Sequence, residues 1–185
     1  MSGRSPRRGL ALATLLAVVA CLSAPAGAAA QDGPAGAVTA SGLATVHPDV
    51  GASVLVDVYW PIDVFRVGGF FGAGAIPSLE DERNRVFAPF GVSLAIDLVF
   101  DPIGVSVRAR GGMWGGATQE EKLTAGAFFG GGAYLTYHLG EGVTLGVGMD
   151  VWAILGAGET AVFAPGITLT FGPAPAAVVS EGNER

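Results

Sequence analysis

A strict two-residue alternation runs from Val143 to Leu155. Its apolar positions are Val143, Leu145, Val147, Met149, Val151, Ala153 and Leu155. The residues between them are mostly small or polar, and Asp150 among them is charged. Successive side chains of a strand point to opposite sides, so a period of two indicates a strand whose faces meet different surroundings. The pattern therefore predicts a sheet with one continuous apolar surface.

Similar alternation recurs along the rest of the chain. The matching segments are 50–60, 64–76, 86–100, 103–114, 125–138 and 162–172. Tight turns are predicted near residues 61, 101 and 140, and longer polar loops at 77–85, 115–124 and 156–161. Short and long connections in turn are typical of an antiparallel up-and-down meander. Residues 37–46 alternate poorly, and we count them as an eighth strand because bacterial outer-membrane barrels have an even number.

Composition indicates which surroundings the apolar face meets. Half of the residues are hydrophobic and 14% are charged, whereas a soluble domain carries about a quarter charged residues. In the body of the chain even long uncharged stretches, such as 123–140, are interrupted by glycine clusters and do not read as membrane helices. The predicted fold is therefore all-β: an antiparallel up-and-down transmembrane β-barrel of eight strands whose apolar face meets lipid.

Six charged residues fall within the predicted strands. They are Asp57, Arg66, Asp97, Arg108, Arg110 and Asp150. All share the parity of most of the Gly, Ser and Thr residues, and none lies on the apolar parity. Because an unpaired buried charge is costly, we expect these three acids and three bases to pair in a filled interior. Glycines on this face would leave space for the larger inward residues Arg66, Phe70, Phe128, Tyr134 and Trp152.

The N-terminus resembles a targeting segment. Arg4, Arg7 and Arg8 precede an apolar run, 10–22, and Ala28-Ala29-Ala30 offers a cleavage site. We predict a signal peptide at 1–30, a lead-in at 31–36, the barrel at 37–172 and a flexible C-terminal tail at 173–185. Val18-Val19-Ala20-Cys21 leaves open a second route, in which cleavage before Cys21 is followed by its lipidation.

Charge and residue types exclude several classes of partner. Removal of residues 1–30 leaves seven basic and sixteen acidic residues, a net charge of −9. That balance argues against nucleic acid as a partner. His47 and His138 have no cysteine or second histidine near enough in sequence to suggest a metal site. We expect no cofactor.

The last predicted strand carries a recognisable pattern, Phe163-x-Pro165-x-Ile167-x-Leu169-x-Phe171. With this strand, residues from about 37 to 172 resemble the small eight-stranded outer-membrane barrels of Gram-negative bacteria, of the OmpA-transmembrane-domain and OmpX type. The resemblance implies that Phe163, Ile167, Leu169 and Phe171 form the signal read by the barrel-assembly machinery, and that the chain resides in outer-membrane lipid. In that family the final aromatic residue usually ends the chain or the barrel domain, whereas here residues 172–185 follow it.

Three functions are compatible with this sequence pattern. The first is a structural or surface-interaction role, with an extracellular partner bound through loops 77–85 and 115–124. The second is a soluble periplasmic barrel with its apolar face turned inward around an apolar ligand. The third is a lipid-modifying enzyme, for which Ser93, Ser106 and His138 are the candidates; no spacing joins them. We expect the first and expect no enzymatic activity.

Overall fold

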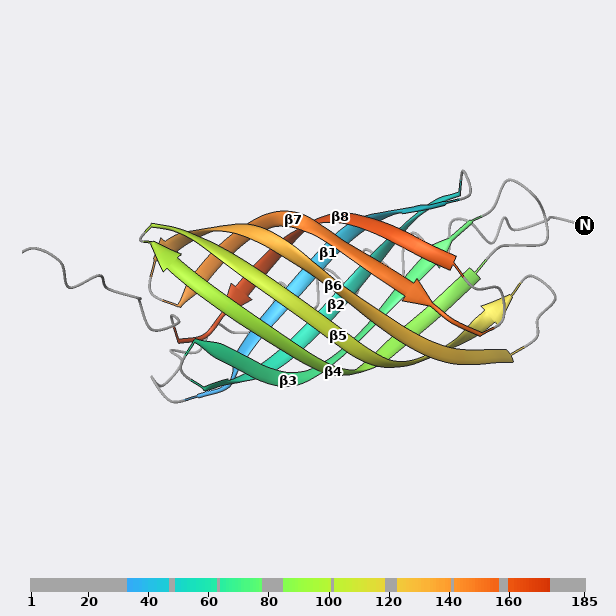
Figure 1. Cartoon of the computed structure of the whole chain (residues 1–185), viewed down its shortest axis with the longest axis horizontal. Coiled ribbons are helices and arrows are strands. Elements are labelled where there is room, and N and C mark those ends of the chain that lie inside the picture. The colour runs from blue at the N-terminus through green and yellow to red at the C-terminus, as the bar shows by residue number, and fades with distance from the viewer. Residues whose placement is uncertain are drawn as a thin grey trace, which may run out of the picture.

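The computed structural model describes residues 33–46, 49–62, 64–77, 85–100, 102–118, 123–140, 142–156 and 160–173. They form eight strands: β1 (Ala35–Thr45), β2 (Val50–Ile62), β3 (Phe65–Ile76), β4 (Arg85–Phe100), β5 (Ile103–Thr118), β6 (Leu123–Gly140), β7 (Val143–Ile154) and β8 (Thr160–Phe171). Each strand pairs with the next, and β8 pairs with β1 to close a barrel (Figure 1). The predicted antiparallel eight-stranded barrel, including its weak first strand, is confirmed. The described residues include no helix with the length and hydrophobicity of a membrane span.

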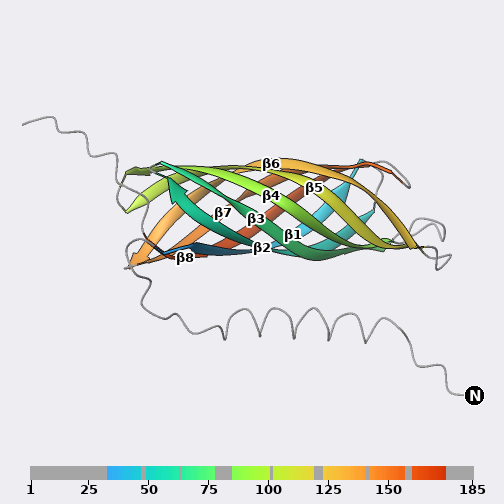
Figure 2. The same ribbon diagram turned by 90° about the horizontal axis from the view of Figure 1, so that it is seen from below.

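The two ends of the barrel differ in their connections. At one end, the turn end, β2–β3, β4–β5 and β6–β7 are joined by two residues each, at 63–64, 101–102 and 141–142. Gly142 has a φ of +74°, which suits glycine, in the last of these turns. At the other end, the loop end, the connections are 46–49, 77–84, 119–122 and 155–159. Figures 1 and 2 show the strands tilted around one axis between these ends.

Some boundaries differ from those that the sequence predicts. Pro61 lies inside β2, opposite Arg66, so the first tight turn comes after it and not at Pro61. The predicted loop 115–124 is wrong over most of its length, because β5 continues to Thr118 and β6 starts at Leu123. Glycine and alanine occupy both faces there, so no apolar alternation marks the strand. β1 begins at Ala35, within the predicted lead-in.

The apolar parity faces outward on β2 to β8. On β7, Val147 is 60% exposed while Asp150 is fully buried. The soluble alternative, with the apolar set inward around a ligand, is wrong because that set forms the outer surface. Outward aromatic side chains near the turn end include Trp60, Phe65, Phe100 and Tyr137. Such a ring of aromatics is the girdle expected where a barrel meets the membrane interface.

Candidate functional site: the filled interior

Small residues on the inner face give the large inward side chains their space. A Cβ on Gly132 would collide with the Asp150 carboxylate, and one on Gly130 would lie 2.5 Å from Cδ1 of Trp152. A Cβ on Gly148 would lie 2.8 Å from Cγ of Tyr134. These glycines sit directly across the β6–β7 ladder from the residues they accommodate. Glycines therefore make room for Tyr134 and Trp152 as predicted, and Arg66, Phe70 and Phe128 also point inward.

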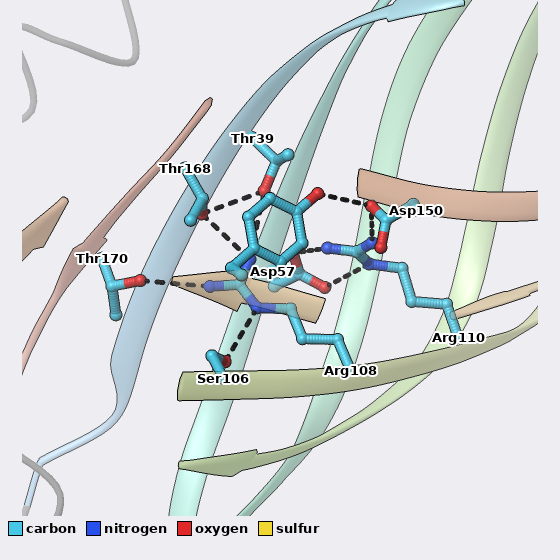
Figure 3. Close-up of polar contacts among 9 residues, drawn as sticks. Thr39, Asp57, Ser106, Arg108, Arg110, Asp150, Thr168 and Thr170 are labelled. Atoms are coloured by element: carbon cyan, nitrogen blue, oxygen red, sulfur yellow. Dashed lines mark hydrogen bonds and ion pairs between the residues drawn. The ribbon is translucent and has the colours of Figure 1, made fainter. Parts of the chain in front are cut away.

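Arg110 on β5 joins three strands across the interior (Figure 3). Its Nε and Nη2 donate to the two carboxylate oxygens of Asp57 on β2, at 3.0 and 2.8 Å. Its Nη1 donates to Oδ2 of Asp150 on β7, at 2.9 Å, and the Tyr134 hydroxyl donates to the same oxygen at 2.8 Å. The Asp57 contact is a bidentate pair, which fixes orientation as well as distance. We call Asp57, Arg110 and Asp150 the central triad.

Arg108 lies on the same strand but contacts hydroxyl groups instead of a carboxylate (Figure 3). Its guanidinium donates to the hydroxyls of Thr39, Ser106, Thr168 and Thr170. Its Cζ also lies 4.7 Å from the ring centre of Tyr134, a cation–π contact. From the sequence we expect each of the six charges to pair with an opposite charge. Arg108 differs, because its direct contacts are with hydroxyl groups and an aromatic ring.

Arg66 and Asp97 form a separate ion pair nearer the turn end. Both side chains are more than nine-tenths buried. The Arg66 guanidinium also lies 5.9 Å from the centre of the Tyr59 ring. The six charges predicted to face inward thus form one triad, one pair and one hydroxyl-bound arginine.

Toward the loop end the interior becomes apolar. The apolar layer comprises Leu43, Leu55, Phe70, Ile76, Phe87, Trp114, Phe128, Trp152, Ile154, Val162 and Ala164. The Phe128 ring packs between those of Phe70 and Trp152, with centroids 5.5 and 5.4 Å apart. Trp114 donates from Nε1 to the Leu155 carbonyl at 2.9 Å. Sequence reasoning gave Trp114 and Phe87 no interior role, although both have inward parity.

The interior offers little for catalysis or metal binding. Ser93 and Ser106 face inward and are 3% and 1% exposed. The Ser106 hydroxyl accepts a hydrogen bond from Arg108, whereas His138 contacts Thr144. No group of three or more His, Cys, Asp or Glu side chains among the described residues is arranged to hold a metal.

Other predicted sites lie on the outer surface or outside the described residues. Phe163 and Ile167 face outward and are 43% and 55% exposed, and Leu169 and Phe171 are half-buried on the same face of β8. Their role in assembly stays a prediction. Several predicted segments lie outside the described residues. They are the signal peptide with Cys21 (1–30), most of the first polar loop (78–84), the centre of the second polar loop (119–122) and nearly all of the tail (174–185).

Comparison with known proteins gives the fold a context. No protein-family model and no curated protein sequence matches the chain. Among solved structures, neisserial surface protein A (NspA) has a TM-score of 0.63 at 12% identity, covering 75% of this chain and 95% of its own. The outer-membrane enzyme PagL has a TM-score of 0.50 at 15% identity, covering 74% and 99%. The chain therefore has the fold of small outer-membrane β-barrels, as its resemblance to them predicts.

Proposed function

We propose that the chain is an outer-membrane barrel with an interior closed to solutes and a structural or surface-interaction role. One observation carries the proposal: the interior is occupied at two levels by side chains that reach across it. The central triad connects β5 with β2 and β7, and the apolar layer packs rings from β3, β6 and β7. An eight-stranded barrel has an interior that side chains can fill.

The outer surface supports placement in a membrane. Large apolar side chains such as Val92, Val147 and Leu135 are 60 to 69% exposed on it. The charged residues at the strand centres, such as Asp57, Arg110 and Asp150, are buried in the interior instead. A contiguous apolar surface of this kind would be a liability in water. Outer-membrane lipid is the environment that fits it.

A non-enzymatic role fits the orientation of the candidate serines. An enzyme that acts on lipid acyl chains needs a nucleophile and a base that the lipid can reach. Ser93 and Ser106 instead point into a filled interior, away from the outer surface. PagL has a related fold and is named an enzyme, so the fold by itself does not decide between the roles. The proposal of a non-enzymatic role therefore depends on the inward orientation of Ser93 and Ser106.

Contact with a partner is proposed for the loop end. The connections at the turn end contain two residues each, whereas one loop-end connection spans 77–84. Exposed loops on a rigid barrel are the usual sites of recognition. The proposed partner-binding segments are 77–85 and what remains of 115–124 between β5 and β6, residues 119–122.

Fractionation of expressing cells tests the membrane placement. We expect the chain in the outer membrane, with gel mobility that changes on heating. Val147→Arg should block assembly, since an arginine facing mid-bilayer lipid costs about 2–4 kcal/mol, whereas Val147→Leu should assemble normally. Recovery of the wild-type chain as a soluble periplasmic protein would contradict the proposal.

Conductance across a planar bilayer tests the closed interior. The purified barrel should insert without producing stable conductance steps, while an open porin serves as the positive control. Steady open channels from the wild-type barrel would refute the closed interior but not the membrane placement. Replacement of residues 77–84 by a short turn should preserve assembly and abolish binding to any surface partner.

A further inference from the structure

A small polar pocket lies inside the barrel near the turn end. Its lining comes from six strands, β3 to β8, and includes Arg66, Asp97, Arg108, Thr136, His138 and Thr170. Thr136 and Thr170 are nearly buried, while His138 and Thr144, closer to the β6–β7 turn, are half-buried. This gradient of exposure indicates that solvent reaches the pocket from the turn end. We call it the turn-end pocket.

Charges in the lining favour an anion. Two guanidinium groups, Arg66 and Arg108, and one carboxylate, Asp97, line the pocket. Asp97 is already engaged by Arg66, which leaves the charge of Arg108. The central triad carries an opposite excess of one negative charge, but Figure 3 places it on the side of Arg108 away from Thr170. Toward the pocket, Arg108 therefore contacts the Thr170 hydroxyl and no carboxylate in the described part of the chain.

Hydrogen-bond donors in the lining remain available. A guanidinium has five N–H groups, and the contacts of Arg108 with four hydroxyls use four of them, the one to Thr170 being long at 3.5 Å. Thr170 accepts from Arg108, so its own O–H is left to donate. Nε2 of His138 is buried and has no hydrogen-bond partner among the described residues. When Nδ1 accepts from the Thr144 hydroxyl, 3.1 Å away, Nε2 carries the proton and is a third donor.

The space restricts the ligand to a small one. The pocket has room for about one water molecule. Phosphate, sulfate and organic carboxylates are larger than a water molecule. A monatomic anion needs only slight widening, and it satisfies several N–H and O–H donors without directional acceptors of its own.

We propose that the turn-end pocket is a binding site for a single halide ion, chloride in the cell. The ion is held by Arg108, Thr170 and His138, and it completes the coordination of Arg108, which contacts no carboxylate among the described residues. Its negative charge lies on the turn-end side of Arg108, and the central triad lies on the other side. Water is the competing occupant, and it would show no dependence on the anion supplied.

Bromide provides a direct probe, because its anomalous scattering identifies it in a crystal. Crystals of the mature barrel grown with sodium bromide should show an anomalous peak in the turn-end pocket. Thr170→Val removes a donor without changing charge or shape greatly, and should remove the peak. Thr168→Val is the matched control, since Thr168 also accepts from Arg108 but does not line the pocket; this variant should retain the peak.

Solution measurements test the same site. Bromide, exchanged for gluconate at constant ionic strength, should raise the temperature at which the folded band is lost on a gel. The bromide concentration that gives half of this stabilisation should rise about tenfold in Thr170→Val, because the variant loses a charge-assisted hydrogen bond to the ion. In Thr168→Val that concentration should stay unchanged. No peak in the wild-type pocket, peaks on the outer surface only, or equal bromide effects in all three proteins would each overturn the proposal. None of these outcomes depends on whether the barrel conducts or binds a surface partner.

Discussion

The two halves of the interior are filled by different kinds of interaction. Toward the loop end, the rings of Phe70, Phe128 and Trp152 are in tilted contact, with centroids 5.5 and 5.4 Å apart. Toward the middle, Arg110 binds Asp57 through two hydrogen bonds at 2.8 and 3.0 Å, and this geometry permits one arrangement. The apolar half is therefore held by packing of rings and aliphatic groups, whereas the polar half is held by hydrogen bonds and ion pairs between strands that are not neighbours.

This difference implies different consequences of mutation. Removal of an apolar ring leaves a cavity whose cost depends on how far its neighbours relax. Removal of one member of a buried ion cluster leaves a charge without a partner, and a second substitution can relieve that cost. The polar half should therefore show strong coupling between mutations, and the apolar half should show near-additive losses.

The largest effect is expected at the centre of the polar half. Arg110→Met leaves Asp57 and Asp150 fully buried without their cation, and should lower the free energy of unfolding by about 4 kcal/mol. Urea titration of the folded barrel in detergent micelles measures this loss. The triple variant Asp57→Asn, Arg110→Met, Asp150→Asn should recover most of it. Equal stability of the single and triple variants would show that the central triad is not coupled.

A cavity in the apolar half should rank second. Phe128→Ala removes a fully buried ring and should lower the free energy of unfolding by about 3 kcal/mol. Phe129→Ala is the matched control, because its ring is 52% exposed on the outer face of the same strand. The control should lose less than half as much in the same urea titration. Similar losses in both variants would mean that the apolar layer packs no more tightly than the lipid-facing surface.

Sequence reasoning succeeded where one face differs chemically from the other. The alternation from Val143 to Leu155 defines both the strand and its outward face, and β7 has that orientation. Residues 115–118 carry only Gly, Ala and Thr, so nothing in the alternation extends β5 through them. The partners of each charge were also beyond prediction. Whether Arg108 or Arg110 meets Asp57 depends on how strands β2 and β5, which are not neighbours, are placed across the lumen.

Glycine-to-alanine variants offer a third test. We expect the substitution to lower the free energy of unfolding on the inner face and to raise it on the outer face. Gly130→Ala places a Cβ 2.5 Å from the Trp152 ring and should cost about 2 kcal/mol through overpacking. Gly111→Ala faces outward with the Phe129 ring at 3.5 Å, and should stabilise by about 0.5 kcal/mol because alanine restricts the unfolded chain. Urea titrations of the two variants and the wild-type barrel measure both changes in the free energy of unfolding. Loss of stability in both variants would show that an added methyl group at Gly111 does not fit beside the Phe129 ring.

The smallest effect separates two hydroxyls on the inner face of β1. Thr39 accepts from Arg108 and donates to Thr168, at 3.2 and 3.1 Å, so Thr39→Val should cost about 1 kcal/mol. Ser41 lies two residues nearer the loop end, and its buried hydroxyl has no hydrogen-bond partner among the described residues. Ser41→Ala should therefore be neutral or slightly stabilising. If Ser41→Ala costs as much as Thr39→Val in the same titration, polar interactions extend farther toward the loop end than the side-chain contacts indicate, and the two halves of the interior are less distinct.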